Sequence, residues 1–258
     1  VILVTTKRGT EGKTTINYKG SLTLSHATTL PEFMNGTHYM QWYNYARRMD
    51  GEKAYFTDEE IAMTTNGDPT DGFENTNWQE PIYRTTLMHQ HNLSISGGNE
   101  KTRYFLSGGF MKQNGFIKGF ELERGNFRSH IDTQVTKDIS VSLNVAGKIN
   151  DYYQPGGDSY ENQTTNNVVG VLLYAAPFVP LEYEGMPTSG YRGASNPEYA
   201  AGHSGYSKIR TMRLETSAKI EYSFPFLKGL KAGMFVGWDW QDRDSRSFKY
   251  SYELMLYK

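Results

Sequence analysis

The sequence predicts an all-β protein: part of a transmembrane, antiparallel, up-and-down β-barrel with short helices in its long extracellular loops. Three observations predict this fold. Seven segments alternate apolar and polar residues, short and long connections alternate between them, and aromatic residues gather at two levels along them. Alternation with period two is the pattern of a strand with one apolar and one polar face. Each segment has roughly ten residues, the length that a tilted strand needs to cross a bilayer.

The fifth segment shows the alternation most clearly. Its Ile139, Val141 and Leu143 fall on one face, while Ser140 and Ser142 fall on the other. The seven expected strands lie at residues 16–25, 90–96, 104–110, 127–135, 139–150, 212–224 and 230–241. In a barrel their polar side chains face the lumen, and these include Lys19, Asn92, Arg128, Asn144, Lys148, Arg213 and Glu215.

The connections between these strands differ strongly in length. Three are short, at residues 98–102, 137–138 and 225–229, and three are longer, at 26–87, 114–125 and 151–210. Because they alternate strictly, a meander places every short turn at one end and every long loop at the other. Outer-membrane barrels have this asymmetry. Alternation by itself also fits a soluble sandwich, which therefore stays open as an alternative.

Aromatic residues on the apolar face lie at two heights. Tyr104, Tyr222 and Phe224 lie beside short turns, whereas Trp238 and Trp240 lie several residues further along their strand. Two aromatic girdles that flank an apolar band are expected at the two lipid interfaces of a membrane barrel. An ordinary core rich in aromatics is the alternative.

The long loops contain helical signals. Residues 31–49 read as a helix, and Thr57 with Glu60 forms a capping box before Ile61. A third helix is expected over residues 168–176, capped by Asn167 and stopped by Pro177. Such helices would fold the loops into walls and lids.

Composition excludes several classes. The 258 residues include 27 basic and 28 acidic side chains, so there is no electrostatic footprint for nucleic acid. Without cysteine there is no disulfide framework, thiolate metal site or thiol nucleophile. No run of 18 apolar residues is present, so no membrane-spanning helix is expected.

Loop aromatics are the candidate substrate-binding residues, because flat rings stack on sugar faces while nearby amides and carboxylates bind hydroxyl groups. They are Trp42, Trp78, Tyr152, Tyr153, Tyr160 and Tyr191. Packing of the loops against each other is the alternative role for each ring, and peptide substrates would use much the same surface.

No catalytic group, metal site or cofactor is expected. His89 and His91 share a strand face without a third ligand nearby, so they read as interfacial histidines. Residues 9–14 end like a phosphate loop but lead into a strand. Residues 68–74 lack the glutamate spacing of a calcium loop.

Three stretches, in this order along the chain, carry a family resemblance: VILVTTKRG at 1–9, HNLSISGGNEKTRY at 91–104 and PFLKGLK at 225–231. They resemble, respectively, the end of the plug domain, the second and third barrel strands with their inner turn, and a later inner turn of the SusC/RagA family of TonB-linked outer-membrane transporters. Trp78 and residues 80–86 also fit the family's approach to its second strand.

This resemblance implies a large plugged barrel, a class for which 22 strands are typical. Residues 1–9 would end the plug, and residues 10–258 would form the first seven or so barrel strands. The rest of the plug, the segment that contacts TonB and later strands would lie outside this piece. The implied location is the outer membrane of a Gram-negative bacterium.

The implied function is active import of oligosaccharides or peptides, powered by the TonB complex and shared with a SusD-like surface lipoprotein. Two other classes remain open: a secreted carbohydrate-binding β-sandwich and a surface glycan hydrolase. No acidic pair in the sequence favours the hydrolase.

Overall fold

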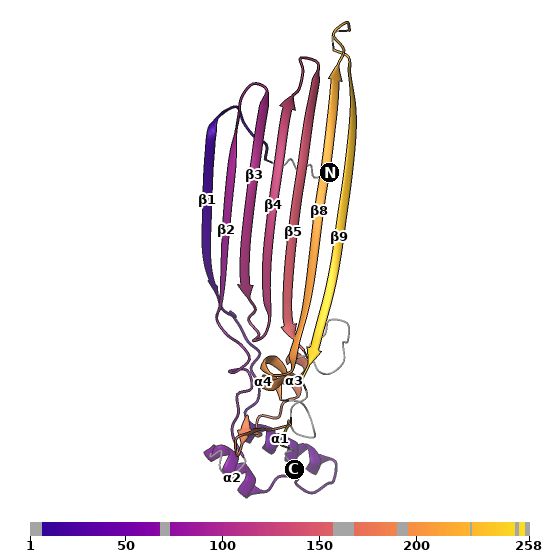
Figure 1. Cartoon of the computed structure of the whole chain (residues 1–258). Coiled ribbons are helices and arrows are strands. Elements are labelled where there is room, and N and C mark those ends of the chain that lie inside the picture. The colour runs from indigo at the N-terminus through magenta and orange to yellow at the C-terminus, as the bar shows by residue number, and fades with distance from the viewer. Residues whose placement is uncertain are drawn as a thin grey trace.

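The computed structural model describes residues 7–67, 73–156, 168–189, 196–227, 229–250 and 253–255. Within them, the main body is one antiparallel sheet of seven strands that lie side by side in chain order (Figure 1). The strands are β1 (Gly12–Ser25), β2 (Thr86–Gly98), β3 (Thr102–Asn114), β4 (Glu121–Gln134), β5 (Ile139–Pro155), β8 (Gly205–Ser223) and β9 (Lys231–Lys249). The predicted meander is confirmed, and most strands extend beyond the segments predicted from alternation.

The short turns close one end of the sheet, and the long connections gather at the other (Figure 1). In the β2–β3 turn, Asn99 Oδ1 accepts bonds from the backbone N–H groups of Lys101 (2.9 Å) and Thr102 (2.8 Å). In the β4–β5 turn, Thr136 Oγ1 accepts from Asp138 (3.2 Å) and Ile139 (3.0 Å). Short polar side chains that bond their own backbone favour such tight turns. The prediction that the short turns lie at one end of the sheet and the long loops at the other is confirmed.

The apolar face of the sheet is bare. Leu143, Ile220 and Val236 on three successive strands are 43%, 42% and 54% exposed. In a sandwich these residues would meet a second sheet about 10 Å away. No second layer of the described chain covers them, because the remaining elements gather beyond one end of the sheet (Figure 1). The soluble β-sandwich alternative is therefore wrong.

The apolar band has the height of a bilayer core. On β8 it runs from Tyr222, paired with Ile139, to Met212, paired with Ile149. Ten residues span about 33 Å along a strand, or about 25 Å of height at a typical tilt of about 40°. Tyr222 lies at the turn end of the band and Trp240, on β9, lies near the other end. This agrees with the two predicted aromatic levels.

The long connections fold into a cap with its own hydrophobic core beyond one end of the sheet (Figure 1). Its elements are α1 (Gly36–Met49), α2 (Asp58–Asn66), α3 (Val168–Tyr174), α4 (Pro197–Gly202) and the hairpin β6 (Glu182–Tyr183) and β7 (Met186–Pro187). The core consists of Met40, Phe56, Trp78, Ile82, Val168, Leu172, Ala176, Phe178, Val179, Ala200 and Ala201. None of the helices in the described ranges is long and apolar enough to cross a membrane.

The predicted helix at 31–49 begins later than expected. Asn35 caps α1 by accepting a bond from the His38 N–H (2.8 Å), so the helix starts at residue 36. The capping box of α2 is confirmed: Thr57 Oγ1 accepts from the Glu60 N–H (3.1 Å), and Glu60 Oε2 accepts from the Thr57 N–H (2.7 Å).

The helices of the third loop also differ from prediction. α3 starts at residue 168 as expected but ends at 174, three residues before Pro177. Asn167, its expected cap, lies outside the described residues. The short α4 was not predicted, although Asn196 caps it and a proline occupies its first position.

Candidate functional site

The polar face of the sheet receives the N-terminal segment. Gly9 is buried so closely on β3 that a Cβ atom there would lie 2.4 Å from the backbone N and O of Tyr104. Lys7 lies over the same face and lines a hollow with the inward side chains of β3 to β8. The residues that precede β1 therefore lie on the polar face of the sheet.

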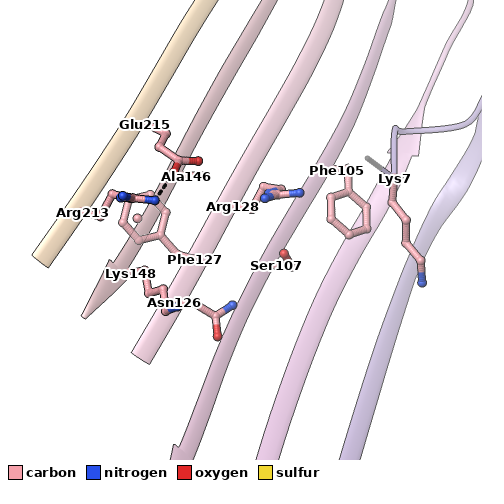
Figure 2. Close-up of a pocket in the computed structure, with 11 residues that line it drawn as sticks. Lys7, Phe105, Ser107, Asn126, Phe127, Arg128, Ala146, Lys148, Arg213 and Glu215 are labelled. Atoms are coloured by element: carbon pink, nitrogen blue, oxygen red, sulfur yellow. Dashed lines mark ion pairs between the residues drawn. The ribbon is translucent and has the colours of Figure 1, made fainter. Parts of the chain in front are cut away.

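This hollow has a volume of about 490 Å³ and takes its walls from four neighbouring strands (Figure 2). Its polar lining consists of Lys7, Ser107, Asn126, Arg128, Lys148, Arg213 and Glu215. Alternation brings these residues together, because positions two apart on one strand and paired positions on the next share a face. Phe105 adds one ring to the lining, next to Lys7 in the view of Figure 2.

Cations dominate the hollow. Arg213 donates to Gln241 Oε1 through Nη2 (2.8 Å) and lies 3.6 Å from Glu215 Oε1. Arg128 and Lys148 have no ion-pair partner among the residues that the structure describes. Four cationic groups therefore face one carboxylate, and among the described residues Arg213 alone of the four has an ion-pair partner, which leaves the others able to bind an added anion. The arrangement can hold carboxylate, sulfate or phosphate oxygens by charge-assisted hydrogen bonds.

Of the predicted substrate-binding aromatics, Trp78 is a packing residue. Its side chain is 3% exposed within the cap core, and its Nε1–H donates to the Ala176 carbonyl (2.9 Å). Thr76 makes a similar link, from Oγ1 to the Val179 carbonyl (2.7 Å). These bonds join the first and third long loops, so the indole cannot present a face to a ligand.

Trp42 lies on the surface of the cap. It is 60% exposed on α1, and its ring makes an edge contact with the ring of Tyr45 at 5.5 Å between centroids. This is the one predicted aromatic among the described residues that presents an open ring on the cap. It is separated in the fold from the cationic hollow, which lies along the strands.

The two tyrosines at the end of β5 point to opposite faces. Tyr152 lies near Phe120, with ring centroids 6.4 Å apart, and Tyr153 carries the Lys208 ammonium 4.7 Å from its ring centroid. Tyr160 and Tyr191 lie outside the described residues. The four predicted aromatics that the structure describes therefore do not form one cluster.

His89 and His91 lie on the outward face near one end of β2. Their ring centroids are 5.4 Å apart, and His91 Nδ1 shares a hydrogen bond with the Tyr18 hydroxyl (2.6 Å). No group of three or more metal-ligating side chains occurs in the described part of the chain. Most of the loop at residues 68–74 falls outside it.

Sequence reasoning named most cations of the hollow as lumen-facing but missed Lys7 and Phe105. Phe105 alternates with outward-facing residues of β3, so its place on the polar face could have been predicted from the sequence. Lys7 was not, because only the fold of the N-terminal segment brings it onto the sheet.

Comparison with known proteins finds relatives among TonB-dependent receptors. No protein-family profile matches the chain. It is 30% identical over 147 residues to the TonB-dependent receptor P3 of Formosa agariphila, a match that covers 57% of this chain and 13% of that protein. It is 24% identical over 267 residues to the TonB-dependent receptor SusC of Bacteroides thetaiotaomicron, covering 94% of this chain and 24% of SusC.

Its fold matches that of the RagAB peptide importer. The TM-score is 0.66 to the closed-closed state and 0.68 to the open-open state, at 17% and 16% identity, over 93% of this chain and 29% of that chain. The resemblance to the SusC/RagA family is confirmed. The chain spans about a quarter or less of the length of these curated relatives. Both relatives are named as TonB-dependent receptors.

Proposed function

We propose that this chain is part of the barrel wall of a TonB-dependent outer-membrane transporter that imports oligosaccharides with a SusD-like surface lipoprotein. One observation carries the proposal: a single sheet exposes an apolar band of about 25 Å on one face and a polar, cation-rich lining on the other. A bilayer covers the first face and a water-filled or plugged lumen suits the second.

The direction of the N-terminal segment supports the plug assignment. Residues 7–9 lie on the polar face, where Gly9 packs on the β3 backbone. We assign residues 1–9 to the end of the plug and residues 10–258 to barrel strands and their loops. The substrate would be held between the external cap and the plug until TonB-driven movement of the plug opens the path.

The oligosaccharide assignment draws on the relationship to SusC and on the open ring of Trp42. A tryptophan face that is free in solution can stack on a sugar ring. The fold match to a peptide importer makes peptide import the second candidate. The same experiment separates the two.

The test uses the full-length protein, expressed in outer membranes with the proposed SusD-like lipoprotein. Uptake of a panel of fluorescent oligosaccharides and of fluorescent peptides is measured with and without an uncoupler that collapses the proton gradient. We expect oligosaccharide uptake that stops with the uncoupler and falls about 3- to 10-fold in Trp42→Ala, with Trp42→Phe close to wild type. Energy-dependent uptake of peptides alone would establish the second candidate, and energy-independent uptake of either would refute active import.

A further inference from the structure

The polar face of the sheet separates its charges by height. Inward residues that pair across neighbouring strands form rows along this face. Two consecutive rows, which we call the cation rows, contain no carboxylate on any of the seven strands. Their charged residues are Lys19 of β1, Arg124 of β4, Lys148 of β5, Arg213 of β8 and Arg243 of β9. Five positive charges therefore lie on this face with no negative charge in their own rows.

The rows on either side do not cancel this charge. Toward the turns, the next row contains Arg128, Glu215 and Asp239, so the three rows together hold six cations and two carboxylates. Toward the long loops, the next row is uncharged and consists of Thr23, Met88, Gln113, Leu122, Tyr152, Ile209 and Ser245. In the described part of the chain, the cap carboxylates that form ion pairs bind cap residues, at Arg47–Glu52 (2.7 Å) and Lys118–Glu198 (3.4 Å).

Nearer the turns, the same face mixes both signs. Glu221 lies between Lys219 (2.8 Å) and Lys231 (3.0 Å), and Glu11 lies 3.6 Å from Arg103. The positive excess is therefore a property of the half of the face nearer the long loops.

The segment before β1 crosses the sheet in the half nearer the turns. Gly9 packs on the backbone of Tyr104, and Tyr104 is five residues from Gly109, which lies in the row of Lys148. Five residues span about 17 Å along a strand. Since this segment leads into the proposed plug, the cation rows lie on the loop side of the place where the plug segment meets the wall. A substrate that enters past the loops would meet them first.

The cations of these rows are open to a ligand. Lys148, Arg213 and Arg243 are exposed, and Lys148 and Arg243 make no hydrogen bond or ion pair with other described residues. Arg124 donates to Asn150 Oδ1 (3.0 Å) and keeps its other guanidinium donors. Lys148 pairs in register with Arg213 on the neighbouring strand (Figure 2), and like charges directly opposite each other are destabilising. A bound anion would remove this repulsion.

We propose that the imported oligosaccharide is anionic and that Arg124, Lys148, Arg213 and Arg243 bind its carboxylate or sulfate groups. The inference rests on the proposed function. The four residues lie on four neighbouring strands, so they spread over about 14 Å across the sheet and about 7 Å along it. An extended chain lying across the strands would meet several cations in turn. Guanidinium groups bind carboxylates through two parallel hydrogen bonds, and a wall of one sign concentrates ligands of the opposite sign.

The test measures binding and energy-dependent uptake by the full-length protein in outer membranes, with the proposed SusD-like lipoprotein. The probes are oligogalacturonides and sulfated galacto-oligosaccharides, each compared with its methyl-esterified or desulfated form, and the neutral oligosaccharide panel. Lys148→Gln combined with Arg243→Gln removes two cations that make no other bond among the described residues. The matched control, Arg103→Gln combined with Lys219→Gln, removes two charges from the same face nearer the turns and leaves Glu221 paired with Lys231.

We expect wild type and the control to bind and import the carboxylated or the sulfated probe about tenfold better than its neutral form. The Lys148/Arg243 variant should bind the charged probe about tenfold more weakly and the neutral form unchanged, while it fractionates with the outer membrane like wild type. The probe that shows this difference identifies the anionic group.

Equal binding of charged and neutral forms by wild type, or an equal loss in the control, would overturn the proposal. Wild-type binding of the charged probe by the Lys148/Arg243 variant would overturn it too, and would assign these cations to contacts with the plug. Energy-dependent uptake of neutral oligosaccharides alone would refute the anionic substrate and leave the proposed function standing. If no oligosaccharide, charged or neutral, shows energy-dependent uptake, the proposed function itself has failed.

Discussion

Replacement of Leu143 by arginine tests which face of the sheet meets lipid. Leu143 lies four residues from the turn end of the band at Ile139, or about 10 Å in height at a typical tilt. It is therefore close to the middle of a band of about 25 Å, and its side chain is 43% exposed on the apolar face. An arginine at the midplane on the lipid side of a barrel costs about 2–4 kcal/mol.

The matched control is Asn144→Arg, one residue along on the polar face. Ser142 is a poorer control than its sequence suggests, because its hydroxyl donates to Asp132 Oδ1 (2.6 Å) and arginine would remove that bond. The assay is a urea titration of the full-length protein refolded into lipid vesicles. A loss in free energy of unfolding at position 143 with little change at 144 is expected. Equal losses at both positions would refute the assignment of faces.

Three further outcomes follow from the cap and from the strand ends. Trp78→Phe should destabilise the cap by about 1–2 kcal/mol, because it removes the indole N–H bond to the Ala176 carbonyl, which keeps only the bond from the Val179 N–H (3.2 Å), and puts a smaller ring in the core; limited proteolysis of the loops should show faster cleavage. Thr57→Ala should cost about 1 kcal/mol through loss of the capping box, read by the same proteolysis, and an unchanged cleavage rate would contradict it. The bonds from Arg210 and then Lys208 lower the pKa of Asp151, outside the apolar band, to about 2. Because the unfolded value is about 3.9, this contribution is complete above about pH 4 and lost as the pH falls toward 2. Asp151→Asn should remove that part of the acid dependence in unfolding titrations.

The sheet was predictable because each strand records its two environments in its own sequence. Alternation fixes which residues share a face, and a slip of one residue would move every apolar side chain to the polar side. The turns were equally local, since Asn99 and Thr136 bond only the next few residues. The face on which each residue lies and the order of the strands could therefore be predicted without knowledge of long-range contacts.

The cap was predictable only in part. The capping box of Thr57 is a local signal and was read correctly. The contact between the first and third long loops was not predictable, because Thr76 and Trp78 donate to carbonyls 103 and 98 residues away in the chain. A loop tryptophan such as Trp78 has the same local sequence whether its ring stacks on a ligand or packs in a hydrophobic core. Its burial, and hence its role, depends on that long-range packing.

At the ends of the strands, alternation of apolar and polar residues predicts the extent of the apolar band better than the extent of the hydrogen-bonded strand. Pairing of β5 with β8 continues through Asp151–Arg210 to Pro155–Tyr206, six residues past the point where the predicted segment weakens at Ile149. The backbone is unchanged there, but the outward positions become charged, so polar residues occupy both faces. A charged outward pair is costly in hydrocarbon and tolerated at the interface. In the proposed membrane location, the loss of alternation inside a continuous strand marks the height at which lipid chains end and head groups begin.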